Sequence, residues 1–146
     1  MRASQQVKYA IYGLFDLAYH GARRPVPVPE IGERQQIPAR YLEQIFQKLR
    51  RAGLVTSKRG PGGGYQLSRP AGEVTLADVI TAIQGTPVLG PDADGPCSAE
   101  SPGFVWPLLY ERVRGGLESI TLGDLCREAA ERGIERRDSE PVMYQI

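Results

Sequence analysis

Residues 38–65 constrain the fold of this chain more than any other stretch. They read PARYLEQIFQKLRRAGLVTSKRGPGGGY. Apolar side chains recur there at the steps of one helical face, at Tyr41, Leu42, Ile45, Phe46 and Leu49. Long polar side chains fill the opposite face, at Arg40, Glu43, Gln44, Gln47, Lys48 and Arg51. The spacing predicts a helix that buries one face and presents hydrogen-bond donors and acceptors on the other.

The residues after this helix predict a tight break and a β-hairpin. Gly53 can take the left-handed conformation that ends a helix. Strands are predicted at 54–57 and 65–68, on either side of the basic, glycine-rich tip 58–64. A polar helix face beside a basic hairpin tip is the arrangement of a winged helix-turn-helix. The predicted fold class is therefore mainly α, with a small β-hairpin as the wing.

The N-terminal residues complete this pattern. A helix is predicted over 4–20, with Ser4 as its N-cap and an apolar surface broad enough for burial on two sides. The second side faces either a partner subunit or one large monomeric core. Prolines alternate with valines before residue 29, which favours an extended arm. A short helix at 29–35 and a turn at 36–37 then precede the helix that Pro38 opens, as in a helix-turn-helix.

The C-terminal half predicts three further helices around a long loop. The first spans 74–84, between a Thr75 cap and Gly85, and the loop 86–103 carries Cys97. The second, over 104–120, has the apolar period of a helix seam, at Trp106, Leu109, Tyr110, Val113, Leu117 and Ile120. The last begins at Thr121 and runs to about residue 132. The tail 133–146 has no predicted structure.

Charge divides the chain into two unlike halves. Residues 1–72 hold 12 Lys and Arg against 4 Asp and Glu, whereas residues 73–146 hold 6 against 13. The basic half has the sign that attracts a polyanion such as nucleic acid. One histidine, no nucleophile–base pair and no metal-ligand cluster argue against an enzyme. The absence of a bilayer-spanning run and of a secretory signal predicts a cytoplasmic protein.

The expected DNA contacts lie on the polar helix and the hairpin tip. Arg40, Glu43 and Gln44 can read base edges in the major groove, since Arg pairs with guanine, Gln with adenine and Glu with cytosine N4. Glu43 alternatively pairs along its own helix with Arg40 or Gln47. Arg59 is the candidate for the minor groove; a solvated turn is the alternative. The full predicted set is Pro38, Arg40, Tyr41, Glu43, Gln44, Lys48, Lys58, Arg59, Gly60 and Gly63.

Three other residues have either two alternative roles or a purely structural role. Tyr41 either reaches a phosphate or joins the core. Cys126 lies on an apolar helical face and is predicted to be a small buried hydrophobe. His20 ends the first helix and is predicted to cap it or lie at the surface.

A nucleotide-binding loop at 59–64 is disfavoured, because no Gly-Lys-Ser/Thr follows and the next segment is a strand.

Several motifs of this sequence resemble those of one known family. They are YLE at 41–43, LRRAGLV at 49–55, RGPGGGY at 59–65 and ITLG at 120–123. The chain resembles the Rrf-two family of bacterial winged helix-turn-helix transcription regulators, which includes IscR, NsrR and CymR. The resemblance implies sequence-specific binding to promoter DNA by a homodimer, with no membrane partner. It also implies that the long C-terminal helices cross between subunits, which makes the six seam residues the dimer interface.

These assignments predict that the chain has four parts. Residues 1–85 form the DNA-binding domain, 86–103 the sensor-type loop, 104–132 the dimerisation helices and 133–146 a tail. A winged-helix module that docks a protein instead of DNA is the alternative function. Salt-dependent binding to a duplex distinguishes the two, because phosphate contacts give a steep salt dependence.

The sensor loop departs from the pattern of cluster-binding members. IscR-type members carry three closely spaced cysteines and a histidine in this loop, whereas this loop has only Cys97, with Glu100 and Gly103 near two of those positions. The helix-one ligand positions of other members correspond to Lys8 and Tyr12. The expectation is a regulator with no cofactor, and an iron–sulfur cluster is the alternative. In either case Cys97 is the candidate sensor of a redox, iron–sulfur, nitric oxide or cysteine-metabolism signal.

Overall fold

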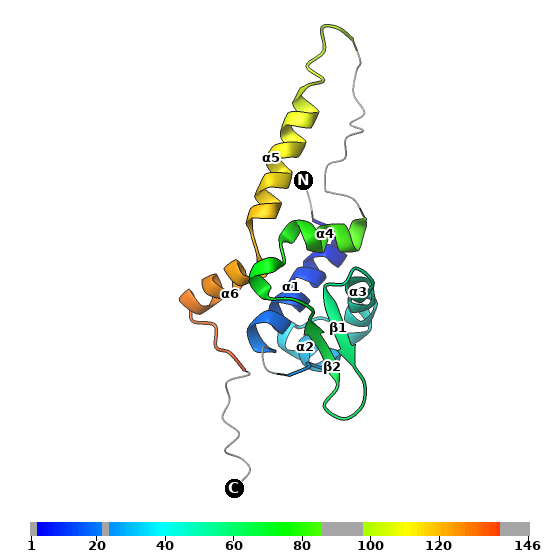
Figure 1. Ribbon diagram of the computed structural model, residues 1–146, viewed down its shortest axis with the longest axis vertical. Coiled ribbons are helices and arrows are strands. Elements are labelled where there is room, and N and C mark those ends of the chain that lie inside the picture. Colours follow the sequence, from blue (N-terminus) through cyan, green and yellow to red (C-terminus); the bar gives the residue numbers. More distant parts are fainter. Residues whose placement is uncertain (1–2, 22–23, 86–97, 138–146) are drawn as a thin grey trace.

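The structure is a computed structural model that describes residues 3–21, 24–85 and 98–137. In these residues it has six α-helices and one two-stranded antiparallel sheet (Figure 1). The helices are α1 Gln5–His20, α2 Val28–Gln35, α3 Ala39–Arg51, α4 Leu76–Gln84, α5 Val105–Ser119 and α6 Leu122–Glu131. The strands are β1 Val55–Lys58 and β2 Gly64–Leu67, followed by the short 3-10 helix η1 Ala71–Glu73. The predicted class, mainly helical with a hairpin wing, is confirmed.

The core forms where α1 meets α2, α3, α4 and the hairpin. Ser4 caps α1 as predicted, because its hydroxyl oxygen accepts the Val7 N–H at 3.2 Å. The inward face of α3 is fully covered, with Leu42, Ile45, Phe46 and Leu49 each at most 3% exposed. The ring of Phe46 packs against that of Tyr65 on β2, with centroids 4.9 Å apart. This burial confirms the predicted amphipathic helix and fixes α3 against the wing.

A buried ionic network joins α1 to α2. The Asp16 side chain is completely buried and accepts hydrogen bonds from Arg34 and from the Gln35 amide. Arg34 also pairs with Glu30 at 3.0 Å, and Glu30 pairs with Arg24 at 2.9 Å. The burial of Arg34 alone would lower its pKa, but the hydrogen bonds and charges of Asp16 and Glu30 raise it. Sequence reasoning did not anticipate this network.

The extended arm before α2 pairs with the wing. Val26 and Tyr65 exchange both backbone hydrogen bonds, each 2.9 Å long, and so add a third strand-like segment to the hairpin. In the hairpin itself Val55 pairs with Leu67 and Lys58 with Gly64, so the strands lie within one residue of the predicted bounds. Gly64 has φ 149°, and a Cβ there would lie 2.3 Å from the Val26 backbone. Only glycine allows the arm to approach this closely.

The helices α4 and α6 begin with the same kind of cap, and these two caps join the start of α4 to the C-terminal end of α5. Thr75 and Thr121 both form capping boxes, with Asp78 and Asp124 respectively, which confirms both predicted caps. The two threonines also pair in an antiparallel bridge, in which the Leu76 N–H donates to the Ile120 carbonyl at 2.9 Å. The end of α5 is thereby tied to the start of α4. From this junction α5 projects away from the rest of the fold (Figure 1).

The C-terminal chain folds back onto the end of α1. Tyr19 donates its hydroxyl proton to the Ile134 carbonyl, and the Arg136 guanidinium lies 4.8 Å from the centre of the Tyr19 ring. His20 is only 5% exposed, and its Nδ1 accepts the Arg137 N–H at 3.0 Å. The predicted capping or surface role of His20 is therefore wrong: residues 133–137, which had no predicted structure, cover it, and Gly21 is the residue that caps α1.

Cys126 lies in the same region, on α6. It is 8% exposed and packs with Tyr19 and Ala129, as predicted for a small hydrophobe. Burial raises the pKa of its thiol despite the opposing charge of Arg136. Cys97 lies outside the described residues. Among the helices that the structure describes, none has the length and apolar character needed to cross a membrane.

Candidate nucleic-acid interface

The N-terminal half of α3 presents the predicted base-reading residues to solvent. Pro38 stands at the N-cap, and its carbonyl accepts the Tyr41 N–H at 3.1 Å, so it begins the helix at the end of the helix-turn-helix turn. Arg40, Glu43 and Gln44 are exposed within the first two turns. Their side chains therefore stand at the end of the helix that enters a major groove in helix-turn-helix proteins.

The turn before α3 depends on one unusual backbone position. Gln36 has φ 57° and ψ 46°, the left-handed conformation, which few residues other than glycine adopt. Its own N–H still bonds to the carbonyl of Gly32. A Cβ on Gly32 would lie 2.6 Å from the Ile37 carbonyl oxygen, so the two helices meet too closely there for a side chain. This close turn fixes the direction in which α3 leaves α2.

Tyr41 is exposed, not part of the core. This residue is 42% exposed, so the buried apolar row that the sequence pattern predicts is interrupted here. Arg40 lies against it, with the guanidinium carbon 4.9 Å from the ring centre and Nη2 donating to the Tyr41 hydroxyl at 3.2 Å. The ring therefore supports the Arg40 side chain and leaves a hydroxyl at the surface, which is the position needed for a phosphate contact.

Glu43 stands beside the wing without a polar partner. Among the residues that the structure describes, its carboxylate makes no ion pair or hydrogen bond, so neither helix pairing suggested by the sequence is formed. Burial raises the pKa of the Tyr65 hydroxyl, and the nearby Glu43 carboxylate adds to that shift. A carboxylate in this position has its hydrogen-bonding capacity available for a ligand.

The tip of the wing presents its two cations to solvent. Lys58 and Arg59 are exposed, and the hairpin extends beyond the helices around it (Figure 1). Gly60 has φ 91°, which an L side chain rarely adopts, and its carbonyl accepts the Gly63 N–H at 2.9 Å. The glycines thus close the tip tightly on itself. Arg59 is left at the end of a narrow hairpin, whose tip can approach another surface closely.

A groove beside α3 brings in residues that sequence reasoning missed. It has a volume of about 420 Å³ and lies between the first turns of α1 and the exposed side of α3. Lys48 reaches across it, and its Nζ donates to the Gln6 side-chain oxygen at 2.8 Å. Gln5 and Tyr9 line the same groove and are joined by a 2.7 Å hydrogen bond. No local sequence signal predicts this approach, because Gln6 and Lys48 lie 42 residues apart.

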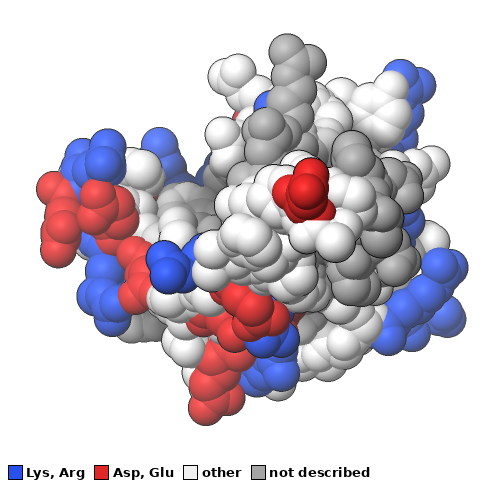
Figure 2. All heavy atoms as spheres, turned by 90° about the horizontal axis from the view of Figure 1, so that it is seen from above, with Lys and Arg blue, Asp and Glu red and all other residues white. Residues whose placement is uncertain are grey.

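Lys and Arg side chains gather along one edge of the folded chain. Figure 2 shows them on the side of α3, whereas the opposite side, where α6 lies, carries Asp and Glu side chains mixed with Lys and Arg. The basic half of the sequence therefore forms a mainly positive surface next to the exposed face of α3, on which Glu43 is the acidic residue of the predicted contact set. Such a surface attracts the phosphates of a duplex.

The predicted dimer residues lie along α5, except for Ile120, which directly follows that helix, and α5 itself has no buried residue. Trp106, Leu109 and Ile120 are about two-fifths exposed, at 41%, 41% and 39%. Tyr110, Val113 and Leu117 are half-buried, and Leu117 borders a small hollow against α4. Further large apolar side chains are exposed at the start of this helix, at Phe104, Val105 and Leu108. A helix with this much exposed apolar surface is typical of an interface.

The described residues do not fit an iron–sulfur cluster. No group of three His, Cys, Asp or Glu among them is arranged to hold a metal ion. Cys126 is buried against Tyr19, His20 bonds to Arg137, and Glu100 is exposed beside Ser98. Such clusters are held by several thiolate or imidazole ligands. Cys97, the predicted sensor, lies outside the described residues, so the structure does not describe its surroundings.

Comparison with known proteins gives a consistent match. The sequence profile of the Rrf2 family, described as an iron-dependent transcriptional regulator, matches residues 3–128. The chain is similar to the HTH-type transcriptional regulator IscR of Photobacterium profundum, with 39% identity over 147 residues, 96% of this chain and 84% of that protein.

Two solved structures resemble the fold closely. An IscR from T. potens has a TM-score of 0.75 and 33% identity, covering 99% of this chain and 96% of that one. CymR, the global cysteine regulator of B. subtilis, has a TM-score of 0.75 and 30% identity, covering 88% and 98%. Together with the exposed polar face of α3 and the basic wing, these matches show that the chain belongs to the Rrf2 family of winged-helix proteins and is a DNA-binding transcriptional regulator, not an enzyme.

Proposed function

We propose that the protein acts as a homodimer on a near-palindromic operator, with α3 in the major groove and Arg59 in the adjacent minor groove. The observation that carries this proposal is the arrangement of one surface. Arg40, Glu43 and Gln44 are exposed on α3, which packs against the wing through Phe46 and Tyr65, and Arg59 is exposed at the tight tip of that wing. Arg and Gln can form paired hydrogen bonds to guanine and adenine, and Glu can accept a hydrogen bond from cytosine.

The remaining predicted contacts are proposed to bind the DNA backbone. Tyr41 is exposed, and Lys48 on α3 and Lys58 on the wing supply positive charge. Such contacts set the register of the protein on the duplex but carry no sequence information themselves. The domain of residues 1–85 is proposed to contain this whole surface, and the protein is proposed to work in the cytoplasm.

The dimer is proposed to form through α5. Its exposed apolar residues, with Trp106 and Leu109 near the projecting end, favour the crossing of α5 with the same helix of a second subunit. A symmetric contact of this kind holds two reading heads at a fixed separation. Half-sites one or more helical turns apart are the expected consequence, with about 34 Å per turn of the duplex.

The test combines sedimentation with DNA binding at several salt concentrations. The wild-type chain should sediment as a dimer and bind a two-half-site duplex with an affinity that falls steeply with salt. Leu109→Asp should sediment as a folded monomer and bind a single half-site about as well as it binds two. Glu111→Gln, an exposed change on the same helix, serves as the control. A wild-type monomer, or duplex binding indifferent to salt, would reject the proposal.

We further propose that the regulator responds to a redox, iron–sulfur, nitric oxide or cysteine-metabolism signal. The Rrf2 family is described as an iron-dependent transcriptional regulator, and the similar CymR of B. subtilis is a global cysteine regulator. Cys97 is the proposed sensor residue. A visible spectrum of protein purified without oxygen tests for a cluster, and operator binding by Cys97→Ser before and after oxidation tests for a thiol. The absence of a visible absorption band would reject the iron–sulfur cluster. Equal responses of the wild type and Cys97→Ser to oxidant would reject the thiol sensor.

A further inference from the structure

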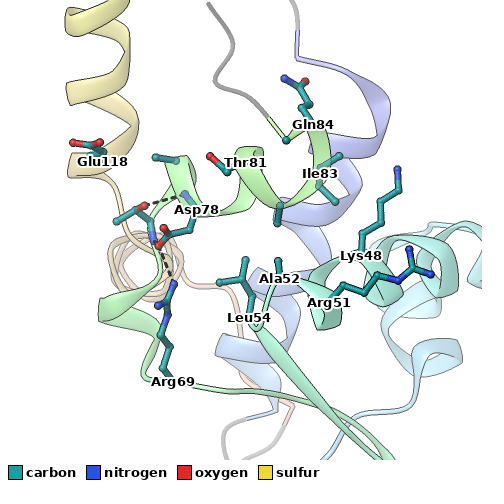
Figure 3. A pocket seen from close by; sticks show the side chains of 14 residues that line it. Lys48, Arg51, Ala52, Leu54, Arg69, Asp78, Thr81, Ile83, Gln84 and Glu118 are labelled. Carbon is teal, nitrogen blue, oxygen red and sulfur yellow. Dashed lines mark hydrogen bonds and ion pairs between the residues drawn. The ribbon is translucent and has the colours of Figure 1, made fainter. Parts of the chain in front are cut away.

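A hollow of about 760 Å³ lies beyond the base-reading residues of α3. Figure 3 shows it between the C-terminal end of α3, the residues leading into β1, and α4, with the last turn of α5 at one side. Its volume is within the range of pockets that bind small molecules. Short side chains leave this space open, among them Ala52, Ala77 and Ala82. Because its walls come from the DNA-reading helix and from the elements that carry α5, we call it the junction groove.

The two ends of the junction groove differ in charge. At one end Arg69 and Asp78 form an ion pair of 3.1 Å and so neutralise each other. Lys48 and Arg51 stand at the other end, one turn apart on α3. Lys48 donates to the uncharged Gln6, and Arg51 has no ion pair or side-chain hydrogen bond with any residue that the structure describes. This end therefore has a net positive charge and an uncommitted guanidinium.

Apolar surface lies between these ends. Leu54 and Ile83 line the groove together with the alanines, and Leu54 is only 3% exposed. The Glu118 carboxylate borders the opposite side and lies 3.9 Å from Arg114 of its own helix. A ligand that fits this lining has an anionic group at one end and an apolar body. The planar fork of an arginine matches a carboxylate in particular, because two parallel hydrogen bonds can form.

We propose that the junction groove binds a small organic carboxylate. Arg51 holds the carboxylate, and the carbon chain of the ligand lies on Ala52, Leu54 and Ile83. The ligand contacts α3 and α4 together, so its binding is coupled to the position of the reading helix relative to the arm that carries α5. By linkage, operator DNA and the ligand then change each other's affinity. This coupling rests on the proposed function, whereas the binding of the ligand does not.

Binding is tested without DNA, by titrating the full chain with straight-chain carboxylates from acetate to hexanoate. Backbone amide resonances report the site, and those of Ala52, Thr81 and Gly85 should shift and saturate. Affinity should rise with chain length, because each added methylene covers more of the apolar floor. Inorganic phosphate should not reproduce the response, since it lacks an apolar body. An equal response to phosphate, or no saturable shift with any carboxylate, would overturn the proposal.

Three variants give the test its specificity. Arg51→Gln should weaken hexanoate binding about tenfold, the loss expected for one charge-assisted hydrogen bond. Arg50→Gln is the matched control, because Arg50 is exposed in the same last turn of α3 but does not line the groove; it should bind like the wild type. Thr81→Trp should abolish binding by filling the groove from an exposed position. Equal affinity in Arg51→Gln and Arg50→Gln would refute the assignment.

The coupling has its own measurement. Operator affinity is compared with and without saturating hexanoate, in the wild type and in Arg51→Gln. The expected result is a change in the wild type that is lost in the variant. A chain that binds hexanoate but no operator would reject the proposed function alone. A chain that binds the operator but shows no saturable carboxylate shifts would reject the groove assignment alone, so the two failures are distinguishable.

Discussion

Arg34 of α2 donates two hydrogen bonds to the buried carboxylate of Asp16 on α1. Nη2 lies 2.6 Å from Oδ1 and Nε lies 3.0 Å from Oδ2, and the Gln35 amide adds a third hydrogen bond of 2.9 Å. The Asp16 side chain has no exposure to solvent. Because α2 supports α3 through the close turn at Gly32, this ion pair sets the relative orientation of α1 and the helix-turn-helix.

Asp16→Asn should therefore destabilise the fold strongly. The change leaves the Arg34 guanidinium, whose side chain is 18% exposed, without its buried counter-charge. Removing one partner of such a pair typically costs about 3–5 kcal/mol. Denaturant unfolding followed by circular dichroism measures the loss. Glu111→Gln is the control, since the Glu111–Arg114 pair lies in solvent and should contribute little. Equal unfolding midpoints for the two variants would contradict this role of Asp16.

Glu30 should contribute a stability that depends on pH. Partial burial alone would raise the pKa of Glu30, but the hydrogen bonds and charges of Arg24 and Arg34 outweigh this and hold it below its usual value of 4.5. The unfolded chain therefore takes up the proton first as the pH falls. The stabilisation by Glu30 is fully present above pH 4.5 and is lost as the pH falls through the lower pKa of the folded state.

Glu30→Gln makes this window measurable. The variant should be less stable than the wild type at pH 7, and the difference should shrink as the pH falls below 4.5. Urea unfolding at a series of pH values gives both curves. Glu33→Gln, an exposed change on the same helix, should show no such convergence. A difference that stays constant, or grows toward acid, would show that the arginine pairing does not set the titration of Glu30.

Arg59→Ala should weaken operator binding by about 1–3 kcal/mol, the usual size of one specific contact. The guanidinium at the hairpin tip is proposed to enter a narrow minor groove, where the negative potential is deepest. Fluorescence anisotropy at fixed salt measures the loss. Arg127→Ala, an exposed arginine on α6, is the control. Replacing the A·T pairs under the wing by G·C pairs should cost the wild type more than the variant; equal costs would remove the wing from sequence recognition.

Glu43→Ala should relax sequence preference more than it weakens binding. The Glu43 carboxylate has no polar partner among the described residues and stands near DNA phosphates in the proposed complex. It therefore repels DNA unless it accepts a hydrogen bond from a base. Selection from a randomised duplex library compares the preferred sites of both proteins. Gln47→Ala, one turn further along the same face, is the comparison variant. Identical selected motifs for the wild type and Glu43→Ala would assign Glu43 no reading role.

Local signals in the sequence predicted most helices and the wing correctly. The apolar period of α3, the caps at Ser4, Thr75 and Thr121, and the break at Gly53 each act within a few residues. A short pattern therefore contains the whole physical cause of such an element. The positions of Arg40, Glu43 and Arg59 on the exposed side followed from the same patterns, because a helix or hairpin with one buried face has only one other face to present.

Contacts between distant residues were not predictable in this way. The Asp16–Arg34 pair spans 18 residues, the His20–Arg137 bond 117, and the Val26–Tyr65 bridge joins the arm to the wing. Tyr41 fitted the apolar pattern of its helix, yet no neighbouring element covers it. Whether a side chain is buried depends on what packs over it, and the sequence around that side chain does not contain this information.

The sequence by itself therefore determined the elements of this regulator and the residues that each of them presents. Periodicity and capping fix the backbone over a few turns, and these causes are local. Only the tertiary structure decided that Asp16 is buried against Arg34, that residues 133–137 cover His20, and that the end of α3 and α4 border the open junction groove. Each of these depends on the packing of segments far apart in the chain.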